Sequence, residues 1–142
     1  MPLTAREKAD LLDRVDLFAN LGGVPLTAVA EGAVEVEFPA GRVIARQGEV
    51  GTGFFLIVSG GARVVRDGDL IETLGPGQFF GELSLIDQQP RFASVIAEGP
   101  TTCLAIASWD FDRLLEEHPR LAIGVLRAVV RRLRVTAAMN RE

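Results

Sequence analysis

The chain has 142 residues, which suits one domain built around one hydrophobic core. Its net charge of −4 argues against non-specific binding of nucleic acid over the whole surface. The single cysteine, Cys103, excludes an internal disulfide and a metal site built from clustered cysteines.

Targeting and membrane segments are not evident in the sequence. No apolar run reaches transmembrane length, and the charged segment 1–16 lacks the apolar centre of a signal peptide. We therefore expect a cytoplasmic protein without a membrane partner. Cys103 lies in an apolar run that ends at Ile106, so we expect it to be a buried small hydrophobic residue.

The first predicted element is a helix over residues 5–18. Leu11, Leu12, Val15 and Phe18 recur at helical spacing with charged residues between them. The pattern predicts that this helix ends before Gly22 and that a short second turn covers 25–31.

From residue 34 onward the pattern changes to short strands. Alternating or apolar segments, separated by turn residues, predict strands at 34–38, 43–46, 53–59, 62–66, 70–74, 78–80, 93–97 and 101–107. Asp67-Gly68 is a strong hairpin signal between two of them. Short strands at regular spacing favour a sandwich or a closed barrel.

Two helices are predicted after the strands. Ser108 suits the N-cap of the first, which ends near His118, and the second runs from about Arg120 to the C-terminus. This last helix carries one apolar stripe, which either covers the core or forms the coiled-coil seam of a homodimer. The stripe consists of Ile123, Leu126, Val130, Leu133 and Ala137.

The segment 80–95 interrupts the strands and offers groups suited to a phosphorylated ligand. Gly81 permits close approach of the backbone, and a helical turn over 82–86 would point free N–H groups toward an anion. Arg91 adds a planar donor fork that matches phosphate, whereas Glu82 can accept hydrogen bonds from a sugar hydroxyl. The segment therefore fits a nucleotide with a single phosphate.

This segment resembles the phosphate-binding cassette of the cyclic-nucleotide-binding domain family, which includes the regulatory subunits of protein kinase A and the catabolite activator protein. The matching residues are Phe80, Gly81, Glu82, Leu83, Pro90, Arg91, Ala93, Ser94 and Val95. The runs 46–49 and 55–60 are also similar to family motifs. The resemblance implies a mainly β fold, an eight-stranded β-roll (jelly roll, or double-stranded β-helix) with an N-terminal helix and two C-terminal helices. We expect one domain over 1–142, with a helical part at 1–32, the β-roll at 33–107 and the C-terminal helices at 108–142.

The same resemblance implies roles for individual residues. Arg91 would hold the cyclic phosphate, Glu82 would accept the ribose 2′-hydroxyl, and Gly81 would lie close to the sugar. Backbone amides of Leu83, Ser84 and Phe92 would complete the phosphate cradle, with Ala93 beside them. The last helix would close over the base, for which the candidate residues are Arg131, Arg132, Leu133 and Arg134.

Phe92 departs from the small residue that is usual in the family at its position. Its side chain has no hydroxyl to contact a guanine amino group, which favours cyclic AMP over cyclic GMP. The ring either packs near the purine or crowds the pocket, and the sequence leaves both readings open.

Three functions follow as hypotheses. The first is a cyclic-AMP sensor that signals through movement of its C-terminal helices. The second is the sensor half of a catabolite-activator-like transcription regulator without its DNA-binding domain, or a degenerate scaffold domain that binds no ligand. In each case we expect this chain not to bind nucleic acid directly. An enzyme is disfavoured because His118 is the single histidine and no acids cluster in the cassette, so we expect neither a metal nor a cofactor.

Overall fold

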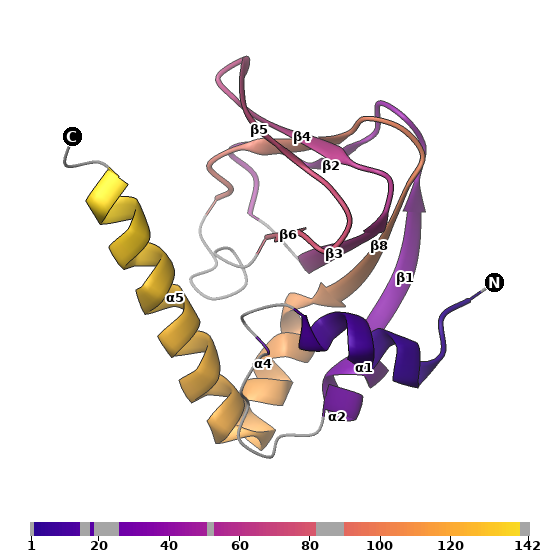
Figure 1. Cartoon of the computed structure of the whole chain (residues 1–142), viewed down its shortest axis with the longest axis vertical. Helices are drawn as coiled ribbons and strands as arrows, with labels where there is room; N and C mark the ends of the chain where they lie inside the picture. Colours follow the sequence, from indigo (N-terminus) through magenta and orange to yellow (C-terminus); the bar gives the residue numbers. More distant parts are fainter. Residues whose placement is uncertain (1, 15–17, 19–25, 51–52, 82–89, 140–142) are drawn as a thin grey trace.

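A computed structural model of the chain describes residues 2–14, 18, 26–50, 53–81 and 90–139. It is mainly β, with helices before and after the strands (Figure 1). The elements are α1 (Ala5–Asp13), α2 (Leu26–Glu31), β1 (Ala33–Phe38), β2 (Val43–Ala45), β3 (Gly53–Ser59), β4 (Ala62–Arg66), β5 (Asp69–Leu74), β6 (Phe79–Phe80), β7 (Ser94–Ala97), β8 (Thr101–Ala107), α4 (Ser108–Glu117) and α5 (Pro119–Met139). The predicted fold class is confirmed.

The strands form two four-stranded antiparallel sheets. The first sheet has the order β1-β8-β3-β6 and the second has the order β2-β7-β4-β5. Strands that are consecutive in the chain alternate between the sheets at several points, so the two sheets wrap into a roll with an interior. The hairpin between β4 and β5 contains the predicted turn, where Asp67 has φ 53° and Gly68 has φ 85°. Both residue types tolerate the left-handed backbone that such a turn requires.

Each face of the first sheet supports one hydrophobic cluster. Alternation along β8 directs Leu104 toward the helices and Cys103 toward the second sheet, and β3 does the same with Leu56 and Ile57. The outer cluster packs the first sheet against all the helices and contains Phe18, Phe54 and Phe111. The inner cluster fills the roll and includes Ala45, Ala62 and Ala93.

Cys103 is fully buried in the inner cluster, as predicted. Burial raises the pKa of its thiol from 9.0 to about 11, because the charged thiolate is poorly solvated there. The side chain is therefore a neutral core residue at physiological pH.

Two helix boundaries differ from the sequence prediction. Helix α1 ends at Asp13, not near Phe18; Phe18 lies in a turn and packs edge-on against Phe54, with 5.7 Å between ring centroids. Its place in the apolar pattern reflects burial in the outer cluster rather than a longer helix. Ser108 is not the N-cap of α4, because β8 runs directly into the helix and Ala107 takes that position without a side-chain hydrogen bond.

Among the described side chains of helix α5, the buried ones lie in its first turns. Leu121 and Val125 are buried in the outer cluster. The predicted stripe is exposed, so it does not cover the core in this structure: exposure is 49% at Ile123, 62% at Leu126, 41% at Val130 and 66% at Leu133. In Figure 1 the helix runs out past α4 along one side of the roll. No helix among the described residues is long and apolar enough to span a membrane.

Candidate functional site

A cavity of about 110 Å³ opens in the roll where the second sheet meets β6 and the segment that precedes β7. Its walls are mostly apolar, with one cationic and one anionic side chain among the described lining residues. These residues are Val64, Glu72, Leu74, Phe79, Phe80, Gly81, Arg91, Phe92, Ala93 and Val95. Four of the sequence-predicted site residues, Gly81, Arg91, Phe92 and Ala93, thus lie together at one cavity.

The backbone of Arg91 is fixed by the loop that follows β2. The Gly48 N–H donates to the Arg91 carbonyl at 2.8 Å, and the Arg91 N–H donates to the Glu49 carbonyl at 2.8 Å. The Gln47 N–H donates to Ser94 Oγ at 2.9 Å. These hydrogen bonds explain why the motif at 46–49 accompanies the cassette. They hold the residues that lead into β7 in the register that directs residue 91 to the cavity.

The guanidinium of Arg91 is held from the other side by β3. Its Nη2 donates to the Gly53 carbonyl at 2.9 Å. Gly81 lies against the same group with φ +91°, and a Cβ at this position would come within 2.5 Å of the Gly53 oxygen and 3.0 Å of Arg91 Nη1. Only glycine satisfies both this conformation and this space, so the glycine makes room for the arginine.

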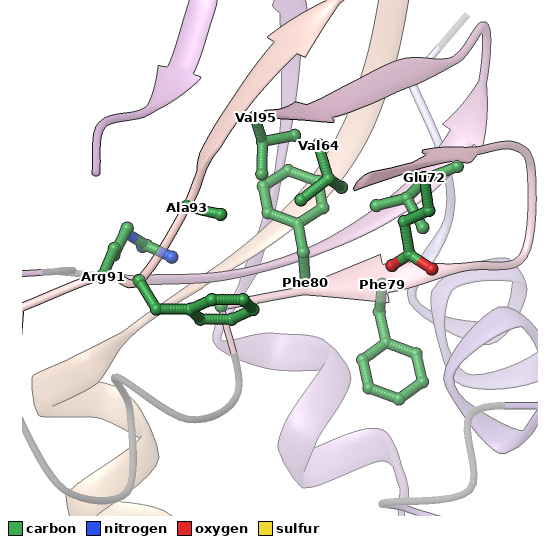
Figure 2. A pocket seen from close by; sticks show the side chains of 10 residues that line it. Val64, Glu72, Phe79, Phe80, Arg91, Ala93 and Val95 are labelled. Carbon is green, nitrogen blue, oxygen red and sulfur yellow. The ribbon is translucent and has the colours of Figure 1, made fainter. Parts of the chain in front are cut away.

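This arrangement places a cation at the cavity. Arg91 is only partly exposed and lines the cavity together with the apolar side chains of Ala93, Phe80 and Val95 (Figure 2). A guanidinium carries five N–H donors in a planar fork, and charge-assisted bonds to phosphate strengthen where solvent is excluded. The Arg91 guanidinium is therefore suited to contact an anionic group.

Phe92 forms part of the cavity wall and leaves its side chain 54% exposed. The Arg66 guanidinium lies 5.8 Å from the centroid of its ring, within the range of a cation–π contact. Ala93 is buried, with 6% of its surface exposed. The aromatic ring therefore stands at the cavity wall with a cation beside it, and it does not fill the interior of the roll.

The other predicted site residues are not brought to the cavity by the described structure. Glu82, Leu83 and Ser84, with the helical turn predicted for 82–86, lie outside the described residues. Arg131, Leu133 and Arg134 are exposed on α5, where Arg132 also belongs to the helix, and no described residue of α5 lines the cavity. The base-covering role of this helix stays a prediction.

Sequence reasoning missed part of the lining. Val64, Glu72, Leu74 and Val95 come from three strands of the second sheet. The period of two along β5 places Glu72 on the same face as buried Leu74, which was a usable signal. Phe79 and Phe80 contribute to both core and cavity.

A second cavity, of about 290 Å³, lies where β1, β3 and β8 meet α4. Its described lining includes exposed Trp109 and Val34, and its single charged side chain is Asp110, which lies 3.5 Å from Arg113. Among its described lining residues there is no cation for an anionic ligand, so the Arg91 cavity is the stronger candidate for ligand binding.

Comparison with known proteins identifies relatives of this chain. The family model described as "Cyclic nucleotide-binding domain" matches residues 35–118. A cyclic nucleotide-gated potassium channel of Rhizobium etli is 36% identical over 122 residues, 86% of this chain and 34% of the channel. The cAMP-dependent protein kinase regulatory subunit of Schizosaccharomyces pombe is 38% identical over 126 residues, 81% of this chain and 30% of that protein. The chain thus spans about a third of these curated relatives.

Solved structures show the same fold. The N-terminal domain of a transcriptional regulator from Streptomyces coelicolor superposes with a TM-score of 0.79 at 32% identity, covering 92% of this chain and 94% of that one. The catabolite activator protein of Thermus thermophilus gives a TM-score of 0.76 at 31% identity, covering 89% of this chain and 62% of that one. The chain belongs to the cyclic nucleotide-binding domain family, a family of regulatory binding domains.

Proposed function

We propose that this chain is a cyclic-AMP sensor. The observation that carries the proposal is the partly buried Arg91 guanidinium, held by the Gly53 carbonyl at the edge of an apolar cavity. Such a site provides a fixed cation for a single phosphate and apolar walls for a purine.

The remaining contacts follow the cassette. Arg91 binds the cyclic phosphate with backbone amides of Leu83, Ser84 and Phe92, and Glu82 accepts the ribose 2′-hydroxyl. Phe92 has no hydroxyl for the guanine amino group, which favours cyclic AMP over cyclic GMP. Its place at the cavity wall supports the reading in which the ring packs near the purine.

Signalling would use the C-terminal helices. Beyond Val125 the apolar stripe of α5 is exposed, which leaves this part of the helix available for a second position. A ligand shifts an equilibrium only if it binds the two states differently, so α5 must contact the ligand or its loop in one state. Arg131, Arg132, Leu133 and Arg134 are the candidates for that contact.

The whole protein would be a regulator. The likeness to the N-terminal domain of a transcriptional regulator supports the sensor half of a catabolite-activator-like protein as the alternative to a stand-alone module. The spacing of Ile123, Leu126, Val130 and Leu133 is that of a short heptad seam, which favours a homodimer through α5. Sedimentation of the wild type against Leu126→Glu tests this seam.

We further propose a cytoplasmic location. We also propose a non-enzymatic role without metal or cofactor, since the cavity presents binding groups and no nucleophile–base pair among its described residues.

The proposal is tested by calorimetric titration with cyclic AMP and by the shift of Tm with ligand. Binding to the folded state must raise Tm by mass action, so no shift at millimolar cyclic AMP would refute the sensor. Arg91→Ala should weaken binding by about 100-fold or more, because the phosphate loses a charge-assisted partner. Arg63→Ala is the matched control, since Arg63 is an exposed arginine of β4 outside the cavity lining.

Near-wild-type affinity of Arg91→Ala would refute the role of Arg91. Equal competition by cyclic GMP and cyclic AMP would refute the selectivity inferred from Phe92.

A further inference from the structure

Glu72 occupies an unusual place in the second sheet. Cross-strand pairs join Ala45 to Val95, Val95 to Val64, and Val64 to Glu72, which forms one row of side chains across β2, β7, β4 and β5. The first three are buried, with 5%, 5% and 6% of their surface exposed. Paired residues of neighbouring strands share a face, so Glu72 continues this row at the sheet edge, where its side chain is exposed and lines the cavity.

The cavity is therefore charged at two ends. Figure 2 shows the Arg91 guanidinium and the Glu72 carboxylate on opposite sides of Ala93, Phe80 and Val64. These two residues are the only charged ones among the described residues that line the cavity. A complementary ligand presents an anion at one end and a hydrogen-bond donor at the other.

An ionised carboxylate accepts hydrogen bonds and donates none. In a purine nucleotide whose phosphate is bound at Arg91, the base is the part directed away from the anion site. The 6-amino group of adenine is a donor on its outer edge, where guanine carries an oxygen that a carboxylate repels.

We propose that Glu72 is a specificity-determining residue that accepts a hydrogen bond from the 6-amino group of the bound purine. The inference rests on the proposed function, because it needs the phosphate at Arg91. It assigns selectivity for the base to the roll itself, through a residue of an edge strand.

The experiment compares cyclic AMP with the 3′,5′-cyclic phosphate of purine riboside, which lacks the amino group and is otherwise the same. Wild-type protein should bind cyclic AMP about tenfold or more tightly than this analogue, as expected for a hydrogen bond to a charged group. In Glu72→Ala the ratio of the affinity for cyclic AMP to the affinity for the analogue should fall to near one. Binding of cyclic AMP should weaken, and binding of the analogue should stay unchanged. Glu72→Gln keeps an acceptor and should give an intermediate ratio.

Asp69→Ala is the matched control, since Asp69 is an exposed carboxylate of the same strand outside the cavity lining. It should leave the ratio unchanged. An equal ratio in wild type and Glu72→Ala would overturn the inference, as would tighter binding of cyclic GMP, whose N1–H and 2-amino donors also suit a carboxylate.

A charged side chain on an edge strand also opposes sheet-to-sheet association. A Glu72→Ala protein that self-associates in light scattering while keeping the wild-type ratio would assign Glu72 to that role and overturn the proposal. If no cyclic nucleotide binds at all, the proposed function fails. If cyclic AMP binds no more tightly than the analogue without the 6-amino group, only the role of Glu72 fails.

Discussion

The two hydrophobic clusters share the first sheet but differ in how they are filled. The outer cluster joins the sheet to the helices with large aromatic side chains, and Phe18 packs edge-on against both Phe54 and Phe111. The inner cluster contains several alanines and borders the opening at Arg91. Close packing stabilises the fold on one face, and small side chains leave room for a ligand on the other.

A matched pair of substitutions tests this contrast with the largest expected effects. Leu104→Ala in the outer cluster should lower the free energy of unfolding by about 3–5 kcal/mol, because Leu104 is fully buried and its neighbours cannot collapse around the space. Leu74→Ala beside the cavity should lower it by about 2 kcal/mol, since less packing is lost there.

Denaturant unfolding measures the decrease in the free energy of unfolding of both variants. Calorimetry should find weaker cyclic-AMP binding only for Leu74→Ala. Equal affinity losses in the two variants would remove the distinction between a structural and a binding cluster.

Gly81 is the point where packing and binding meet. Gly81→Ala should cost about 2–3 kcal/mol of stability, because a Cβ at φ +91° is strained and would contact the Gly53 oxygen. It should also weaken cyclic-AMP binding, since the same Cβ displaces Arg91.

Gly68→Ala is the control: Gly68 has φ +85° with nothing within 4 Å of the added Cβ. It should cost about 1 kcal/mol with unchanged affinity. Identical behaviour of the two variants would mean that the close approach at Gly81 has no role in the site.

Cys103 gives the smallest expected effect and reports on the inner cluster alone. Its pKa is raised by burial from 9.0 to about 11, so the folded state holds the thiol proton more tightly than the unfolded state. This contribution to stability is fully present below pH 9 and is lost as the pH rises toward 11.

The slope of unfolding free energy against pH should therefore be steeper in the wild type than in Cys103→Ala over that range. Rapid modification of the native thiol near pH 8 would contradict its burial.

Most of the fold follows from sequence patterns that report local geometry. Alternation located the strands within one or two residues, and Asp67-Gly68 identified the hairpin because few residues adopt positive φ. The prediction that the first helix extends to Phe18 was wrong, because apolar spacing reports burial and a residue in a turn can also be buried. The prediction of Ser108 as an N-cap was wrong, because β8 leads directly into α4 and leaves no separate capping residue.

The candidate site divides in the same way. Arg91 and Gly81 could be predicted from the cassette, since their chemistry and spacing are local. For Glu72 the alternation along β5 gives only the face of the strand, because its position opposite Arg91 depends on the pairing of β5 with β4 and of β4 with β7. The hydrogen bonds from Gly48 and Glu49 to Arg91 likewise join residues some forty positions apart.

The most direct test of the central claim is a crystal structure of the protein with cyclic AMP bound. We expect the cyclic phosphate within about 3 Å of the Arg91 guanidinium and the purine directed along the apolar walls toward Glu72. A nucleotide bound elsewhere, or bound here with its base against Arg91 and its phosphate in solvent, would contradict the account.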